Sequence, residues 1–141
     1  MILEIIYSFG TDFSKSSIRA TRGFVAIGNG LGLGNTLIDS CIFVTQYSCI
    51  EARSSQCLIS QNIFGALDTS KANNFLDPSY AVTLFDAGIY RVNDNFFFGQ
   101  KIAGIQTNDL TRPSEYRNNR FYNGTLDLEL NGNSNADYTI S

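Results

Sequence analysis

VNDNFF, residues 92–97, is the segment from which the fold is predicted, because its pattern returns elsewhere in the chain. Three further segments share its pattern, in which the fourth residue is small or polar and the sixth is Phe. They are IDSCIF at 38–43, ISQNIF at 59–64 and YRNNRF at 116–121. The aligned positions are Cys41, Asn62, Asn95 and Asn119, which are 21, 33 and 24 residues apart. Similar segments at irregular spacing are typical of a stack of coils whose loops differ in length.

A second strand is expected downstream of each repeated Phe. Phe97 to Ile102 and Phe121 to Leu126 are both five residues, so the alignment extends there without a gap. Extension predicts one stacked inward row of Ile50, Val82, Ile102 and Leu126, and a second of Ala52, Leu84, Gly104 and Leu128. Each coil would cover the next at about 4.8 Å, so these rows would form the core. The sequence therefore predicts an all-β parallel solenoid of about five coils.

The repeated Asn has a structural role in this prediction. The side-chain amides of Asn62, Asn95 and Asn119 are expected to bond to the neighbouring coils, while the Asn backbone adopts a left-handed turn. Cys41 interrupts the row, and we expect it to pack there as a small apolar group.

This I-x-x-N-x-F coil resembles the right-handed parallel β-helix of the pectin-lyase-like superfamily, and most of all the β-helix module of bacteriophage tailspikes and tail fibres. The resemblance covers roughly residues 24–130. It implies a homotrimer that binds a cell-surface polysaccharide on the virion, after assembly in the host cytoplasm. Lyases, hydrolases, epimerases and non-catalytic spikes share this fold, so the resemblance alone does not choose among them.

Length and charge limit the domain organisation and the kinds of partner that the chain can have. The 141 residues predict a single domain, with a cap or incomplete coil at 1–23, coils at 24–130 and a strand or tail at 131–141. The net charge is −3 and no basic run is present, so nucleic acid is not an expected partner. The short apolar opening contains Glu4 and fits neither a secretory signal nor a membrane span, so no membrane insertion is expected.

The cysteine and histidine counts limit the chemistry. Three cysteines, Cys41, Cys49 and Cys57, cannot all pair within one chain, which favours a reducing compartment. There is no histidine, so neither a mixed zinc site nor a Ser-His-Asp arrangement is expected. We predict no metal and no cofactor, and any acid–base chemistry would depend on carboxylates, Tyr or Lys.

Two groups of carboxylates are catalytic candidates for a polysaccharide depolymerase. Asp127 and Glu129 stand two apart on one expected strand and would point the same way about 7 Å apart, within the range of an inverting glycosidase. Asp86, Asp109 and Glu115 form the second group. The alternative for the first pair is a solvated strand face, which the sequence favours.

Ligand-binding candidates come from the outward positions of the same alignment. One outward column is Glu51, Thr83, Ala103 and Asp127, and the next is Arg53, Phe85, Ile105 and Glu129. Phe85 is the best carbohydrate-stacking residue, with Arg53 beside it; Arg112 could orient a carboxylate or pair with Asp109. Tyr122, with Phe96 and Phe98, is expected to point outward, toward either a sugar or a neighbouring subunit.

Variable loops are expected at residues 66–80 and 107–114, with a glycine-rich turn at 28–35. Three functions stay open at this point. They are a polysaccharide-binding spike module, a polysaccharide-degrading enzyme and a purely structural β-helix segment.

Overall fold

The structure is a computed structural model. It describes residues 3–6, 12–15, 17–20, 24–27, 35–45, 48–53, 56–65, 80–85, 88–110, 112, 114–122, 124–131 and 138–140. Within these residues every regular element is a β-strand, and no helix long and apolar enough to cross a membrane is found there. The predicted glycine-rich turn up to residue 34, and the predicted loop up to residue 79, lie outside them.

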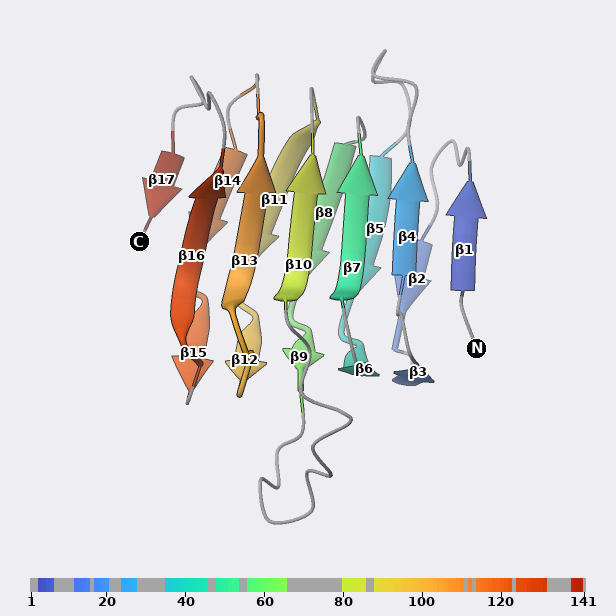
Figure 1. Cartoon of the computed structure of the whole chain (residues 1–141). Helices are drawn as coiled ribbons and strands as arrows, with labels where there is room; N and C mark the ends of the chain where they lie inside the picture. Colours follow the sequence, from blue (N-terminus) through green and yellow to red (C-terminus); the bar gives the residue numbers. More distant parts are fainter. Residues whose placement is uncertain are drawn as a thin grey trace.

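The strands form three parallel sheets (Figure 1). Sheet A contains, in order, β1 (Leu3–Ile6), β4 (Phe24–Ile27), β7 (Ser48–Arg53), β10 (Tyr80–Phe85), β13 (Ala103–Asn108) and β16 (Leu126–Asn131). Sheet B contains, in order, β2 (Asp12–Ser14), β5 (Asn35–Asp39), β8 (Gln56–Ser60), β11 (Ile89–Asn93), β14 (Ser114–Arg117) and β17 (Tyr138–Ile140). Sheet C contains β3 (Ser17–Ala20), β6 (Ile42–Thr45), β9 (Ile63–Phe64), β12 (Phe96–Phe98) and β15 (Arg120–Tyr122).

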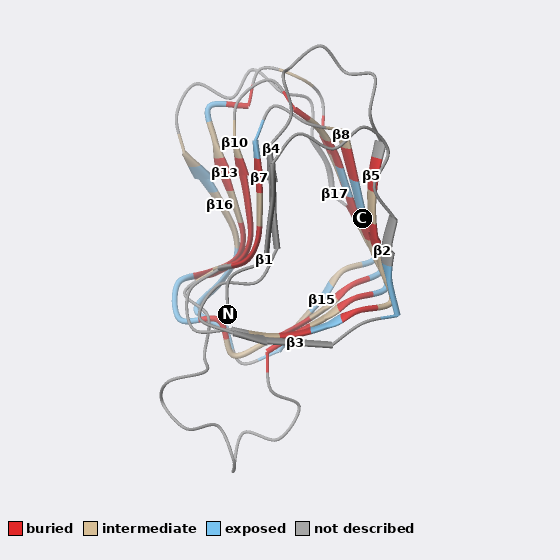
Figure 2. Cartoon of the chain, turned by 90° about the vertical axis from the view of Figure 1, so that its right-hand side faces the viewer, coloured by how far each residue is buried: buried red, intermediate tan, exposed pale blue. Residues whose placement is uncertain are grey.

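The chain visits the sheets in the fixed order A, B, C and then returns to A, and we call each such passage a coil. Figure 2 shows the coils end on, with the three sheets as three walls around one interior. Every pair of neighbouring strands is parallel, including the four pairs among the five strands of sheet C. The all-β class with parallel strands is confirmed, and the arrangement is compatible with the predicted β-helix.

The predicted asparagine ladder lies at the corner between sheets B and C. The main-chain N–H of Cys41 donates to Asn62 Oδ1 at 2.9 Å, that of Asn62 to Asn95 Oδ1 at 2.9 Å, and that of Asn95 to Asn119 Oδ1 at 3.1 Å. Each Asn Nδ2 donates in turn to a carbonyl of the preceding coil, such as Ile59 O at 2.9 Å from Asn95. Cys41 is buried in this row, as expected of a small apolar substitute.

One detail of the ladder prediction was wrong. The left-handed residue is the one before each ladder position: Ser40, Gln61, Asp94 and Asn118 have φ of 55°, 54°, 59° and 53°. The Asn itself sits past the turn, where its side chain points into the interior and its amide reaches both neighbouring coils. The preceding side chain is left outside, and Gln61, Asp94 and Asn118 are exposed.

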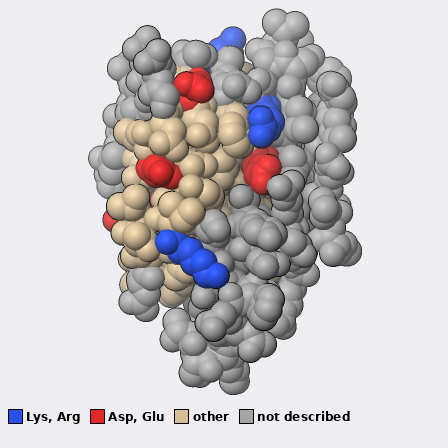
Figure 3. All heavy atoms as spheres, viewed as in Figure 1, with Lys and Arg blue, Asp and Glu red and all other residues tan. Residues whose placement is uncertain are grey.

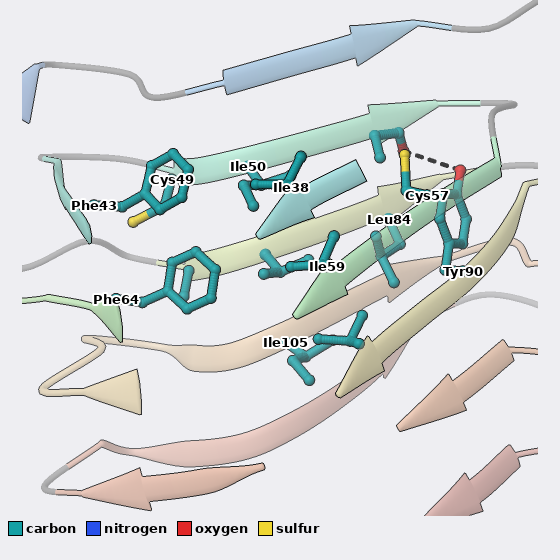
Figure 4. Close-up of a cluster of buried hydrophobic side chains, with 14 of the residues drawn as sticks. Ile38, Phe43, Cys49, Ile50, Cys57, Ile59, Phe64, Leu84, Tyr90 and Ile105 are labelled. Atoms are coloured by element: carbon teal, nitrogen blue, oxygen red, sulfur yellow. Dashed lines mark hydrogen bonds between the residues drawn. The ribbon is translucent and has the colours of Figure 1, made fainter. Parts of the chain in front are cut away.

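The repeated Phe residues form a continuous stack inside sheet C. The ring centroids are 5.3 Å apart for Phe43 and Phe64, 5.0 Å for Phe64 and Phe97, and 4.6 Å for Phe97 and Phe121. Beside the stack, Figure 4 shows Ile38, Ile50, Ile59 and Ile105 extending from sheets A and B into the same interior. Cys41, Cys49 and Cys57 are all free and buried.

The predicted rows of sheet A are correct up to β10 and wrong beyond it. Val82 pairs with Ile50 as expected, but its next partner is Ile105, followed by Leu128. Ile102 and Leu126, which were assigned to the inward row, are 38% and 47% exposed. Similarly, Leu84 stacks between Ala52 and Thr107, so Gly104 does not belong to that row.

Turn length explains the part of this shift that lies between β13 and β16, where Leu126 pairs with Ala103 and not with Ile102. The rest of the offset lies between β10 and β13, where Val82 pairs with Ile105. Four residues, 99–102, join β12 to β13, whereas three, 123–125, join β15 to β16. The side chain of Gln100 is buried in the longer turn, where its Nε2 donates to the carbonyls of Phe98 and Phe64 at 2.9 and 3.3 Å. Ungapped extension from the Phe repeat could not detect the extra residue, because turns carry no hydrophobic period.

The expected loop at residues 107–114 is partly strand. Thr107 and Asn108 belong to β13, Ser114 begins β14, and Leu110 between them is buried. At the two ends, β1 pairs with β4 and β17 pairs with β14. The predicted domain limits at 23 and 130 stay predictions.

Candidate functional site

The outer face of sheet A carries a group of interacting polar and aromatic side chains. The register gives one outward column of Glu51, Thr83, Gln106 and Glu129, and a second of Arg53, Phe85, Asn108 and Asn131. The predicted outward columns were therefore correct in β7 and β10 and wrong in β13 and β16. Ile105, expected to point outward, is buried in the core.

Arg53 and Phe85 form the aromatic part of this face. They are paired in the register, as the sequence predicts, and the Arg53 guanidinium carbon lies 3.9 Å from the Phe85 ring centroid. Arg53 is exposed and Phe85 is half-buried, so the pair can be reached from solvent. A guanidinium on an aromatic face is held by about 0.5–1 kcal/mol at an exposed site, which orders its N–H donors.

A hydrogen-bonded network of amides and one carboxylate extends from this pair. Gln106 Nε2 donates to Glu129 Oε2 at 3.0 Å, and Asn108 Nδ2 donates to Gln106 Oε1 at 3.3 Å. The Tyr80 side chain joins the network through hydrogen bonds with Glu129 and Gln106. These contacts cross the coils of β10, β13 and β16, so the face is one continuous surface.

The network changes the acidity of Tyr80. Burial raises the pKa of Tyr80 above its ordinary 10.0, and the negative charge and hydrogen bond of Glu129 raise that pKa further. The hydrogen bond from Gln106 acts in the opposite direction. The hydroxyl is therefore a neutral donor at neutral pH.

The backbone beneath the Arg53–Phe85 pair is held from inside by Tyr90. The Tyr90 hydroxyl, on β11, lies 2.7 Å from the carbonyl oxygen of Phe85 and 3.2 Å from that of Ala52; Figure 4 draws the second of these. Tyr90 is fully buried, and Gly88 leaves room for its ring, because a Cβ at residue 88 would overlap it. A large residue of sheet B thus positions the carbonyl ends of two sheet A strands.

The structure places Asp127 and Glu129 differently from the expected pair. Asp127 lies opposite Gly104, in the row of the buried Cys49 and Ala81, whereas Glu129 lies in the outward row of Gln106. A Cβ on Gly104 would meet the Phe121 ring of the core, which shows that this row faces inward. Asp127 itself is exposed and Glu129 is half-buried, and a catalytic role for either stays a prediction.

The second acidic group is not assembled by any contact among the described residues. Asp109 is an exposed left-handed residue with φ of 51° whose N–H donates to Asn131 O at 3.0 Å. Glu115 lies on β14, 3.2 Å from Arg117 Nε, and accepts a bond from Asn93 Nδ2 at 3.2 Å. Arg112 is half-buried and Asp86 lies outside the described residues.

Tyr122 belongs to a different surface, the outer face of sheet C. It is 42% exposed and stacks on Phe98 with centroids 5.0 Å apart. The four sequence-predicted ligand residues therefore divide between surfaces, and only Arg53 and Phe85 come together. Tyr80, Gln106 and Asn108 were missed, because Tyr80 follows a loop and the other two lie beyond the register shift.

Figure 3 shows this face of sheet A with a few acidic and basic groups among uncharged atoms. Within the described part of the chain, no cluster of three His, Cys, Asp or Glu side chains is arranged to hold a metal ion. No protein-family model, curated protein or solved structure matches this chain.

Proposed function

We propose that this chain is a right-handed β-helix module of spike type that binds a cell-surface polysaccharide through the outer face of sheet A. We call the binding surface the outer site, and define it by Arg53, Tyr80, Phe85, Gln106, Asn108 and Glu129. The single observation that carries the proposal is the stacked Arg53–Phe85 pair beside a network of amides and a carboxylate. Sugar recognition needs these groups, since rings stack on the apolar faces of sugars and amides bond to hydroxyls.

A neutral or acidic polysaccharide suits the outer site better than a compact ligand. The interacting side chains are spread over four neighbouring strands, β7, β10, β13 and β16, which lie about 4.8 Å apart. An extended chain of sugars would contact several of these strands in turn. The parallel stack thus places the side chains of the outer site at regular intervals, so that successive sugars of a polymer could bind to them.

Binding is favoured over hydrolysis by the separation of the carboxylates. Glu51 and Glu129 share the outward column but lie three strands apart, about 14 Å, beyond the range of a glycosidase pair. A depolymerase therefore has weaker support than a binding module.

A homotrimer on the virion is part of the proposal. Its support is the outward row of sheet C that contains Phe98 and Tyr122, where Tyr122 is 42% exposed and stacks on the half-buried Phe98. Exposed apolar side chains that gather on one face are typical of contacts between subunits. Sedimentation velocity of the purified protein, with and without Tyr122→Ser, tests this part: the wild type should sediment as a trimer, and the variant should dissociate.

A glycan array of bacterial surface polysaccharides, probed with the purified protein, tests the function. For any polysaccharide that binds, Phe85→Ala should weaken affinity by at least tenfold, since about 1.4 kcal/mol of stacking and desolvation is lost. Arg91→Ala is the matched control, because Arg91 is exposed on the outer face of sheet B, away from the outer site.

Two results would contradict the proposal. One is the absence of binding to every polysaccharide by a protein whose circular dichroism shows it folded. The other is binding that survives Phe85→Ala and Arg53→Ala together.

A further inference from the structure

The corner between sheets B and C contains a recess that is separate from the outer site. Its lining residues are Asp94, Phe96, Asn118, Asn119 and Arg120, and its volume is about 470 Å³. That volume lies within the range of small-ligand pockets. It is large enough for one sugar unit.

The repeated turn of the coil builds this recess. Asp94 and Asn118 are the left-handed residues of two successive turns, and both side chains are exposed because the ladder position follows them. Phe96 and Arg120 are paired on β12 and β15, and the Arg120 guanidinium carbon lies 5.4 Å from the Phe96 ring centroid. A ring, a cation, a carboxylate and an amide are thus brought to one place.

The charged groups of the recess are not used by the fold. Among the described residues, neither Asp94 nor Arg120 makes an ion pair, whereas the neighbouring Arg117 pairs with Glu115 at 3.2 Å. Exposed charges left apart in one recess are available to a ligand with complementary groups.

The ladder leaves one further donor at this point. The main-chain N–H groups of Cys41, Asn62 and Asn95 each donate to an Asn side chain of the following coil. Within the described chain, the N–H of Asn119 has no such acceptor, although the Asn119 side chain donates to Val92 O at 2.6 Å. This N–H continues the direction of the ladder, toward the following coil, so the Arg120 guanidinium is the donor that the recess offers to a carboxylate.

We propose that the corner recess binds a uronic acid unit. The sugar carboxylate is held by Arg120, the sugar ring lies against Phe96, and Asp94 and Asn118 bond to hydroxyls. The Asp94 carboxylate repels an acidic group at its own end of the recess, so the sugar binds in one direction. This inference goes beyond the outer site, because it uses other residues, a different corner of the coil and a specific acidic ligand.

The test compares methyl β-glucuronide with methyl β-glucoside by NMR titration of the ¹⁵N-labelled protein. The glucuronide should shift the backbone signals of Asn119 and Arg120, and should bind at least about tenfold more tightly than the glucoside, since a charge-assisted hydrogen bond is gained. Acetate, titrated alone, should bind more weakly than the glucuronide, because it lacks the ring and the hydroxyls.

Two variants localise the effect. Arg120→Gln should reduce the glucuronide affinity to the level of the glucoside. Arg117→Gln should preserve the difference, since Arg117 is an equally exposed cation nearby that does not line the recess. Arg53→Ala, which alters the outer site, should leave glucuronide binding intact, so a failure of the outer site and a failure of the recess are distinguishable.

The proposal is overturned by any of three results. They are the absence of a saturable shift at Asn119 and Arg120, an unchanged preference for glucuronide in Arg120→Gln, and acetate binding as tightly as the glucuronide. The last result would make the recess a simple anion site.

Discussion

The side-chain oxygen of Asn95 accepts two hydrogen bonds from Asn62, one from the main-chain N–H at 2.9 Å and one from Nδ2 at 3.1 Å. Asn95 is fully buried, and its own Nδ2 donates to the carbonyls of Ile59 and Asn93, both at 2.9 Å. One amide therefore satisfies polar groups of two coils that water cannot reach. Such a residue is expected to contribute far more to stability than a surface Asn.

Asn95→Ala should lower the free energy of unfolding by about 3 kcal/mol, because the N–H of Asn62 and the carbonyl of Ile59 lose their partner in the interior. Urea denaturation measures the change. The matched control is Asn93→Ala, two residues earlier, whose side chain bonds to Glu115 and Arg117 at the surface. Equal losses in the two variants would contradict a structural role for the ladder.

Phe97→Ala should lower the free energy of unfolding by about 3–5 kcal/mol. The ring is fully buried between Phe64 and Phe121, so truncation opens a cavity that neighbouring coils cannot fill without moving. Phe98→Ala, the next residue, removes a half-buried outer ring and should cost clearly less. Thermal and urea unfolding of both variants provide the comparison, and a larger loss for Phe98→Ala would show that the stack is not the core of sheet C.

Gly88→Ala should destabilise the fold by more than Gly99→Ala does. A Cβ at residue 88 would overlap the Tyr90 ring and displace the hydroxyl that bonds to the Phe85 carbonyl. Gly99 has φ of 65°, and a Cβ added there would have nothing within 4 Å, so Gly99→Ala costs only the backbone strain of about 1 kcal/mol. The measurement is the free energy of unfolding of each variant, compared with that of the wild type. If Gly88→Ala is as stable as the wild type, Tyr90 does not hold the outer site in place.

Stability should fall at alkaline pH partly through Tyr80. The pKa of Tyr80 is raised in the folded state, so the folded chain keeps a proton that the unfolded chain loses near pH 10. The contribution of Tyr80 is therefore complete below that pH and is lost as pH rises through the folded pKa. Free energies of unfolding at about pH 8 and about pH 11 should differ less in Tyr80→Phe than in the wild type. An equal pH dependence in the two proteins would show that Glu129 and burial do not act on Tyr80.

Much of the fold could be predicted from sequence pattern because two of its features are local and repeated. The Asn and Phe positions recur at fixed distance from one another, so the stacking of Asn62 on Asn95 and of Phe64 on Phe97 followed from alignment alone. The pairing of Arg53 with Phe85 also followed, since the register of β7 and β10 could be read from their matching apolar residues.

The remaining features depended on turns and on close packing, which leave little trace in the sequence. The extra residue at 99–102 shifted β13 by one residue relative to β16, and the register between β10 and β13 placed Gln106 and Asn108 where Ala103 and Ile105 were expected.

What the sequence by itself determined is the repeat, the all-β class and the inward Phe and Asn rows, because buried stacking demands like residues at like positions. Only the tertiary structure decided the outer site and the corner recess. Both are made by side chains from different coils. Those of the outer site meet according to the length of each turn, and those of the recess lie in the repeated segments, where the structure decides which side chains are left exposed.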